Sequence, residues 1–176
     1  MTRTRIDAFE LAARPMAIWD KQWFLLSAGD FAAKKFNNMT VSWGSLGVIW
    51  GKPFAMCVVR PQRHTFKFME QSDTFTLCVF PQQYRKVLDV LGTKSGRQMD
   101  KINASGFTPE AATAVASPVY AEAELAIECR KVYFQDFDPK HFLAPYIAPL
   151  YNNDYHRMYF GEIVAVTGAD AYRAGT

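Results

Sequence analysis

Two short segments carry the side chains best suited to hold a small anionic molecule. The first, Asn38 to Gly44, sets an amide and two hydroxyls beside a large indole. The second, Arg60 to Thr65, holds two guanidinium groups and a hydroxyl within six residues. A phosphate monoester needs its charge and its acceptor oxygens satisfied together, whereas a planar ring needs apolar walls with a few polar groups at its edge. Together the segments predict a flat aromatic ligand that carries a phosphate.

Each segment taken alone also has an ordinary structural explanation. Two arginines three residues apart, Arg60 and Arg63, are common in a solvated loop. Met39, Val41 and Trp43 alternate with polar residues, which is the pattern of a half-buried strand. The ligand hypothesis therefore depends on both segments lying in one site.

Two later groups of residues extend this hypothesis. Ser95-Gly96-Arg97, followed by Lys101, combines a flexible turn, a hydroxyl and two cations at a predicted helix start, where free N–H groups favour an anion. This group is either a second phosphate contact or a plain surface loop. His156 opens a predicted strand and could reach the ring of the ligand or a substrate, although a single histidine on a strand is more often packed or solvated.

The composition describes a folded domain with little excess charge. The chain has 176 residues, 49% hydrophobic and 15% aromatic, and a net charge of +3, which suits one packed domain over residues 1–176. Its cations are dispersed, without the basic run typical of nucleic-acid binding. No segment approaches the roughly 18 apolar residues of a membrane span, and the N-terminus has no secretory signal. We expect a cytoplasmic protein that binds neither nucleic acid nor membrane.

Residue spacing argues against several other cofactor sites. Cys57, Cys78 and Cys129 form no Cys-x-x-Cys pair, which predicts reduced, buried thiols. The three histidines lie far apart in the sequence, so no metal site is expected. The glycines at positions 44, 47 and 51 match neither a dinucleotide fingerprint nor a phosphate loop. A pyridine nucleotide would therefore have to bind transiently over a ligand already in place.

The pattern of apolar residues and turn formers predicts a protein made mainly of strands. Short helices are expected over residues 64–70 and 82–91, the second ended by Gly92, with a turn at 96–101. Residues 103–118 and 139–149 are expected to be irregular. The predicted strands cover residues 16–19, 23–27, 38–43, 54–59, 74–80, 121–134 and 156–166. Strands without alternating helices favour an antiparallel barrel or sandwich.

The order of these motifs resembles the flavin reductase-like family, particularly its flavoredoxin branch. The similarity covers roughly residues 15–166 and includes the two opening segments, Ser95-Gly96-Arg97, Lys101 and the strand that ends Gly161-Glu162-Ile163-Val164. It implies a mainly β fold, an antiparallel FMN-binding split β-barrel of Greek-key type with a few short helices. It also implies a homodimer that holds FMN non-covalently in a groove between its subunits.

The resemblance further implies which residues contact FMN. The expected contacts are Asn38, Met39, Thr40, Val41, Ser42 and Trp43 along the ring and ribityl chain, and Arg60, Arg63, Thr65, Ser95, Gly96, Arg97 and Lys101 around the phosphate. His156 is expected to approach the flavin from the last strand as a catalytic residue. Two positions depart from the family pattern: Cys78 stands where many relatives have serine, and Asn37 doubles Asn38, so either amide could contact the ligand.

A flavin accepts a hydride and passes on electrons one or two at a time. The resemblance therefore implies an FMN-dependent oxidoreductase of the NAD(P)H:flavin reductase type, in which NAD(P)H or a reduced partner protein supplies electrons for another acceptor. Two alternatives remain open, a non-enzymatic FMN electron carrier and a pyridoxamine-phosphate-oxidase-like split barrel for another small ligand. The donor, the acceptor, and whether FMN is a fixed cofactor or a released substrate also stay open.

Overall fold

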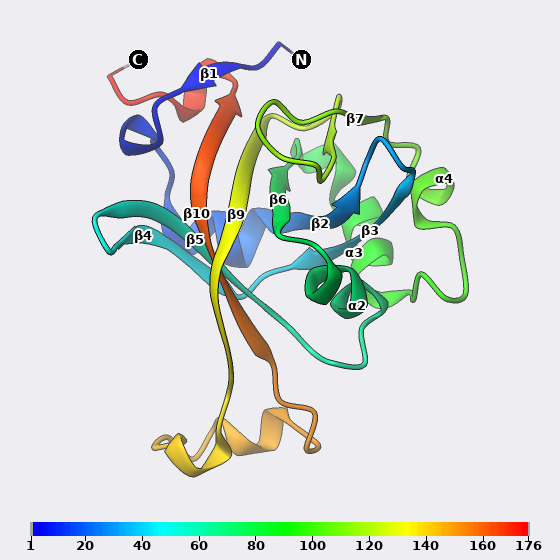
Figure 1. Cartoon of the computed structure of the whole chain (residues 1–176), viewed down its shortest axis with the longest axis vertical. Helices are drawn as coiled ribbons and strands as arrows, with labels where there is room; N and C mark the ends of the chain where they lie inside the picture. The colour runs from blue at the N-terminus through cyan, green and yellow to red at the C-terminus, as the bar shows by residue number, and fades with distance from the viewer. Residues whose placement is uncertain (1, 176) are drawn as a thin grey trace.

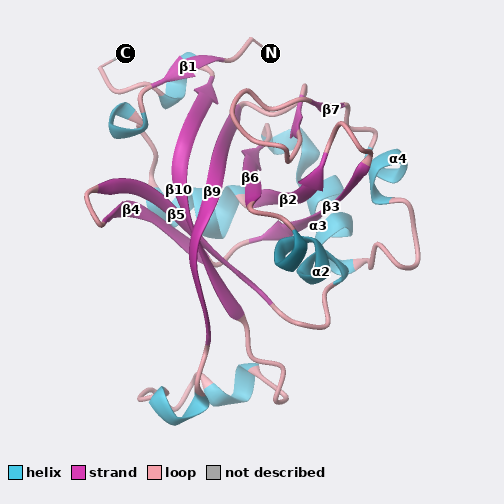
Figure 2. Ribbon diagram, in the orientation of Figure 1, coloured by secondary structure: helices cyan, strands magenta, loops and turns pink. Residues whose placement is uncertain are grey.

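One curved antiparallel sheet organises the chain (Figures 1 and 2). The computed structural model describes residues 2–175. Strands follow the order β3-β2-β6-β9-β10-β5-β4, and β1 pairs with the end of β10 that β5 leaves free. The strands are β1 (Thr4–Ile6), β2 (Phe24–Asp30), β3 (Lys35–Val41), β4 (Gly44–Ile49), β5 (Lys52–Val59), β6 (Thr74–Val79), β9 (Leu125–Asp136) and β10 (Arg157–Gly168), with β7 (Pro109–Glu110) and β8 (Val119–Tyr120) forming a separate pair.

The helices are short and lie at the margins of the sheet. In Figure 1, α2 and α3 lie beside β2 and β3, and α4 lies farther out. The α-helices are α1 (Pro15–Ala17), α2 (His64–Gln71), α3 (Arg85–Thr93) and α4 (Lys101–Ser105). A π-helical turn, η2 (Ile18–Gln22), follows α1, and single 3-10 turns are η1 (Ala8–Glu10), η3 (Gln82–Tyr84), η4 (Pro139–His141), η5 (Ala148–Leu150) and η6 (Asp170–Tyr172).

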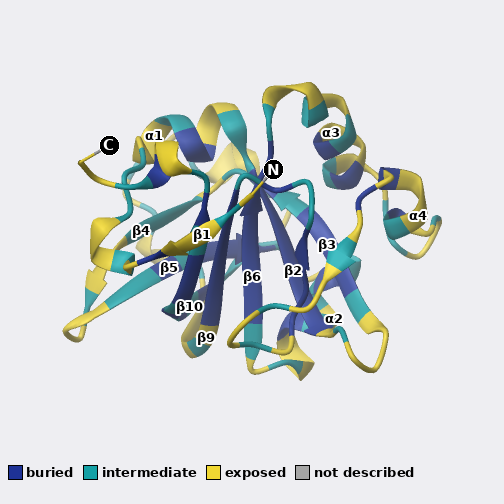
Figure 3. Cartoon of the chain, turned by 90° about the horizontal axis from the view of Figure 1, so that it is seen from above, coloured by how far each residue is buried: buried dark blue, intermediate teal, exposed yellow. Residues whose placement is uncertain are grey.

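The sheet is buried on both faces over much of its width. Its inner face encloses the main core, which includes Phe24, Phe75 and Tyr159. A second apolar cluster, with Leu88 and Phe107, covers the outer face. Figure 3 shows the result as dark, buried strands at the centre with exposed residues around them. Strands buried on both sides lose the alternation of apolar and polar residues that marks a half-exposed strand.

The strand predicted over residues 121–134 begins later than expected. β9 starts at Leu125, runs to Asp136 and is buried on both faces through Cys129, including Glu128. The Glu128 carboxylate accepts hydrogen bonds from the Thr113 N–H and hydroxyl, both at 2.9 Å, and from the Ala114 N–H at 2.6 Å. The carboxylate therefore holds the neighbouring loop on the sheet.

The predicted strand at residues 16–19 is wrong. Pro15 occupies the first position of α1, where its fixed φ favours a helix. The helical turn that follows buries Ile18 and Trp19, and the Trp19 ring lies 4.5 Å from that of Phe24. Gly92 also differs from prediction, because α3 continues through it to Thr93.

Strand β4 was not predicted, because its two glycines lower the strand propensity of residues 44–49. A two-residue turn at Trp50 and Gly51, with φ of 51° and 70°, joins β4 to β5. Positive φ at both residues is the conformation that hairpin turns require. In the sequence, the only sign of this turn is Gly51, which follows Trp50.

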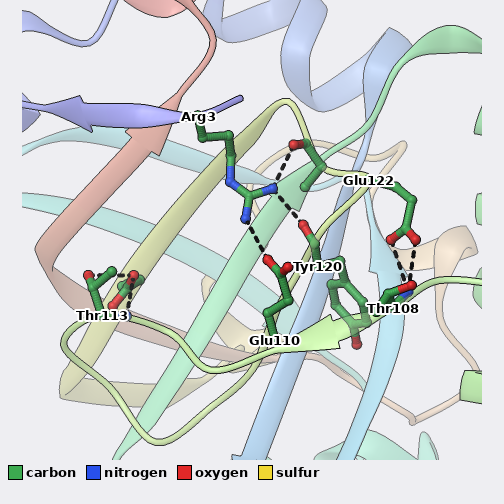
Figure 4. A network of polar contacts seen from close by, with 8 residues as sticks. Arg3, Thr108, Glu110, Thr113, Tyr120 and Glu122 are labelled. Atoms are coloured by element: carbon green, nitrogen blue, oxygen red, sulfur yellow. Dashed lines mark hydrogen bonds and ion pairs between the residues drawn. The ribbon is translucent and has the colours of Figure 1, made fainter. Parts of the chain in front are cut away.

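The N-terminal segment is fastened to the loop before β9 (Figure 4). The Arg3 guanidinium donates from Nη1 to the carbonyls of Tyr120 at 2.5 Å and Ala123 at 2.7 Å, and it forms an ion pair with Glu110 at 3.4 Å. The Glu122 carboxylate accepts the Thr108 N–H at 2.9 and 3.0 Å. These contacts fix the position of Tyr120, whose buried hydroxyl bonds to the side chains of Ser27 and Asn38.

The three cysteines match the sequence expectation. Cys57, Cys78 and Cys129 are buried free thiols, as predicted, and burial raises the pKa of the Cys57 and Cys78 thiols to about 12. Within residues 2–175, no helix is long and apolar enough to cross a membrane, and no group of histidine, cysteine and acidic side chains is arranged to hold a metal ion.

Candidate functional site

The candidate site lies where the sheet is open. Strands β3 and β4 follow each other in the chain but stand at opposite ends of the strand order, and residues 42–43 connect them. A groove of about 240 Å³ occupies this opening. It is lined by Met39, Thr40, Val41, Ser42, Trp43, Val58, Arg60, Arg63 and His156. The structure thus brings together most of the first predicted segment, both predicted arginines and the predicted histidine.

The outer edge of β3 gives the groove its polar groups. This strand pairs only with β2, so its other edge has no strand partner. The Asn38 carbonyl faces that edge, where it accepts hydrogen bonds from the Thr65 hydroxyl at 3.1 Å and from Lys101 Nζ at 3.2 Å. Because backbone groups alternate between the two edges, Thr40 presents its N–H and C=O at the same edge. These groups can pair with the polar rim of a flat ligand.

The side chain of Asn38 points away from the groove. It is fully buried and donates from Nδ2 to the Tyr120 hydroxyl at 3.0 Å, which also bonds to the Ser27 hydroxyl at 2.9 Å. The Asn37 amide instead donates to the Thr65 hydroxyl at 2.7 Å, beside Gly96. Of the two asparagine side chains, that of Asn37 therefore lies nearer the predicted phosphate contacts, and Asn38 serves to hold β3 in place.

Two cations, Arg63 in the groove lining and the buried Lys101 near it, lie close together. Lys101 is 4% exposed and donates to the Leu91 carbonyl at 2.5 Å as well as to Asn38, while Arg63 donates to the Gly92 carbonyl. Burial, together with the charge of Arg63, lowers the pKa of Lys101 to about 8. Burial and the charge of Arg60 lower the pKa of Arg63. Among residues 2–175, neither Arg63 nor Lys101 forms an ion pair, so an anion would relieve their mutual repulsion.

The turn at Ser95-Gly96-Arg97 lies against the start of α2. A Cβ on Gly96 would lie 2.6 Å from the Asn37 side-chain oxygen and 2.9 Å from the His64 ring, so this close approach requires glycine. The Ser95 hydroxyl accepts the Arg97 N–H at 3.2 Å. His64 Nδ1 is buried without a hydrogen-bond partner, and its pKa is lowered by burial and by the charges of Lys67, Arg97 and Lys101.

Arg60 lines the groove and already has partners on the loop that precedes β10. It forms an ion pair with Asp154 at 2.6 Å and donates to the Leu150 carbonyl at 3.0 Å. The Asn152 N–H, Arg60 and Gln62 hold the pKa of the Asp154 carboxyl well below its usual range. Because Arg60 is already paired, Arg63 and Lys101 are the stronger candidates for an anion.

His156 is held between the groove and the loop that precedes β10. Its Nδ1 lies 2.9 Å from the Tyr151 hydroxyl, and its ring lies 5.2 Å from that of Trp43. Burial and the charges of Arg60 and Arg63 lower its pKa to about 4, against the opposing effect of Asp154. The imidazole is therefore neutral at pH 7 and can hydrogen-bond without adding charge to the groove.

Sequence reasoning missed several residues of this site. His64, Tyr151 and Asp154 complete the contacts around the predicted ones, and Val58 lines the groove. His64 could have been found, since it lies between Arg63 and Thr65. Tyr151 and Asp154 come from a segment far along the chain, and nothing in their local sequence links them to Arg60.

Comparisons with known proteins agree with this architecture. The model of the flavin reductase like domain matches residues 22–174, whereas no curated protein sequence matches the chain. Among solved structures, the chain is similar to flavoredoxin of Desulfovibrio vulgaris (Miyazaki F), with a TM-score of 0.66 and 21% identity over 92% of this chain and 76% of that one.

Two further structures show the same fold. An FMN-binding domain of a flavin reductase-like enzyme from Shewanella baltica OS155 has a TM-score of 0.68 and 15% identity over 95% of this chain and 77% of that one. The NADH:FAD oxidoreductase SgcE6 of Streptomyces globisporus C-1027 has a TM-score of 0.63 and 15% identity over 85% of this chain and 76% of that one. These likenesses confirm the predicted split β-barrel. Together with the family match over residues 22–174, they establish that the chain belongs to the flavin reductase-like domain family.

Proposed function

We propose that the protein binds FMN non-covalently in the groove beside β3 and acts as an FMN-dependent oxidoreductase. The observation that carries this proposal is the combination of an open strand edge with two cations that form no ion pair within residues 2–175, Arg63 in the lining and Lys101 on the Asn38 carbonyl of the same edge. A flat ring suits the edge and the wall formed by Trp43, while a phosphate suits the cations. The similarity to an FMN-binding domain supports the same ligand.

In this proposal, different residues bind the ring and the phosphate of the flavin. Residues 39–43 hold the flavin ring and ribityl chain through the open backbone edge and the indole. The phosphate is bound by Arg63, Lys101 and the turn at residues 95–97. Lys101 has three N–H donors and uses two of them on the carbonyls of Leu91 and Asn38, which leaves one for a phosphate oxygen. Thr65 supports the site from behind by fixing the Asn38 carbonyl.

In this proposal the residues of the groove position the flavin and do not themselves act as acids or bases. Bound flavin supplies hydride and single-electron transfer, which no amino-acid side chain in the groove offers. Trp43 and Val58 keep water from one face of the site. His156, neutral at pH 7, is proposed to hydrogen-bond the edge of the ring, with Tyr151 fixing its orientation. No carboxylate lines the groove within the described residues, so none competes for the phosphate or acts there as a general base.

The size of the groove supports a homodimer. A volume of about 240 Å³ falls below the roughly 300–1,000 Å³ typical of complete small-molecule sites. We infer that a second copy of the chain closes the groove over the flavin. The reduced, buried thiols suit the cytoplasm. The electron donor is proposed to be NAD(P)H or a reduced partner protein, and the similarity to an NADH:FAD oxidoreductase supports the former.

The test is a titration of the purified protein with FMN, followed by anaerobic addition of NADH or NADPH. The proposal predicts saturable quenching of FMN fluorescence and bleaching of the oxidised flavin absorbance on adding a nucleotide. Protein that takes up no FMN would contradict the binding site. Protein that binds FMN but is reduced by neither nucleotide would instead act as an electron carrier for partner proteins.

A further inference from the structure

A second, larger cavity adjoins the groove. The ends of β9 and β10 extend as an arm that carries the loop of residues 137–156 away from the sheet (Figure 1). Between this loop and the strands lies a cavity of about 640 Å³, within the roughly 300–1,000 Å³ of ligand sites. Its lining is Trp43, Gln135, Asp136, Phe137, Asp138, His141, Phe142, Ile147, Leu150, Tyr151 and Met158.

The walls of this aromatic cavity favour a flat ligand. The rings of Phe142 and Tyr151 are nearly parallel, with centroids 5.9 Å apart and an angle of 17° between their planes. Phe137 meets Phe142 edge-on at 6.3 Å, and Trp43 contributes an indole that is 42% exposed. Aromatic rings gain additional stabilisation when they stack or meet edge-to-face with other rings.

Several polar groups of the lining already have partners within the protein, which favours an uncharged ligand. Both oxygens of Asp136 bond to Arg157, at 2.6 and 2.8 Å, and Asp138 accepts the Lys140 N–H at 2.9 Å. Gln135 accepts the Tyr133 hydroxyl at 2.9 Å. Among the described residues, no lysine or arginine lines the cavity. An anionic ligand would therefore meet the Asp138 carboxylate without a lysine or arginine in the lining, and a cationic one would find both oxygens of Asp136 already bonded to Arg157.

One polar group connects the cavity with the groove. The Tyr151 hydroxyl lies 2.9 Å from Nδ1 of His156, which lines the groove, while Trp43 lines both spaces. A hydroxyl can donate one hydrogen bond and accept another. With His156 neutral, its Nδ1–H can donate to Tyr151, whose own proton is then free for a ligand.

We propose that the aromatic cavity binds an uncharged aromatic carbonyl compound whose oxygen accepts a hydrogen bond from the Tyr151 hydroxyl. This binding site does not depend on flavin occupying the groove. Because Trp43 borders both spaces, such a ligand would lie directly beside the proposed flavin site.

The test uses 2-acetylnaphthalene as the probe and 2-naphthoate as a charged molecule of similar shape. Equilibrium dialysis of the full chain should show saturable binding of the ketone, at least about tenfold tighter than binding of the carboxylate. Ile147→Trp, which fills the cavity, should weaken ketone binding at least about tenfold. Leu143→Trp is the matched control, because Leu143 lies in the same loop, is 95% exposed and does not line the cavity.

A second variant tests the hydrogen bond itself. Tyr151→Phe should weaken ketone binding about three- to tenfold, the effect of one neutral hydrogen bond, and should leave the binding of 2-ethylnaphthalene unchanged. If Ile147→Trp fails to fold, as judged by circular dichroism, Leu150→Trp takes its place. Equal weakening of both probes by Tyr151→Phe would overturn the assigned hydrogen bond.

Failure of this proposal can be told apart from failure of the proposed function. Absence of saturable ketone binding, equal affinity for the carboxylate, or no effect of either cavity-filling tryptophan would overturn the cavity assignment. A second copy of the chain that occupies the cavity would produce the first of these results. The FMN titration is run on the same samples, so protein that binds the ketone but not FMN contradicts only the flavin proposal.

Discussion

Lys101 should make FMN binding depend on pH. The ammonium group is 4% exposed, and burial together with the charge of Arg63 lowers its pKa to about 8. Only the protonated form adds charge to a phosphate site. A bound phosphate with two negative charges would raise the pKa of Lys101, so binding takes up a proton from solution. The affinity for FMN should therefore fall as the pH rises through about 8.

The size of the effect follows from the same pKa. With a pKa of about 8 in the free protein, Lys101 is about 90% protonated at pH 7 and about 10% at pH 9. If the phosphate raises the pKa in the complex above about 10, the affinity falls about tenfold over this range, or about 1.4 kcal/mol. The second pKa of a phosphate monoester is about 6, so its own titration adds little above pH 7.

Fluorescence titrations with FMN and riboflavin from pH 7 to pH 9 would measure this effect. Riboflavin carries the same ring without the phosphate, so the ratio of the two affinities isolates the phosphate contribution. Lys101→Met should abolish the pH dependence of that ratio, and the exposed Lys94→Met should preserve it. A ratio that stays constant with pH in the unmodified protein would refute the assignment of Lys101 to the phosphate site.

Three further predictions follow from the described contacts. Arg63→Ala should weaken FMN binding by about 1–3 kcal/mol, roughly five- to 150-fold, as expected for one charge-assisted partner; an unchanged titration would remove Arg63 from the site. Tyr120→Phe should lower the free energy of unfolding by about 1–3 kcal/mol in urea, because Ser27 and Asn38 both lose a buried partner. The ring protons of His156 should keep constant NMR shifts from pH 8 down to about pH 5, since its pKa is lowered to about 4; a midpoint near 6.5 would contradict its burial.

Most of the groove lining could be named from sequence because its main parts are local. The segment from Met39 to Trp43 is one continuous piece of chain, and Arg63 lies near the start of a short helix. Each piece has a recognisable composition, and their order along the chain matches one family. The fold class was likewise predictable, because runs of β-branched and aromatic residues mark β5, β6 and β10.

The details that sequence could not show depend on contacts between distant residues. Arg60 forms an ion pair with Asp154, which lies 94 residues away in sequence. The burial of Glu128 could not be predicted, because a strand pattern does not show that a second layer covers the sheet. Local propensity is overridden wherever such tertiary contacts are stronger.

The open edge of β3 also affects how the protein behaves without its ligand. An edge with unpaired N–H and C=O groups is a template for pairing with another chain, and proteins usually cover or blunt such edges. Here Thr65 and Lys101 cover the edge at Asn38. Around Thr40 the edge opens into the groove. A molecule bound in the groove would thus cover this edge and oppose aggregation. Loss of that molecule would leave the edge of β3 free to pair with another chain.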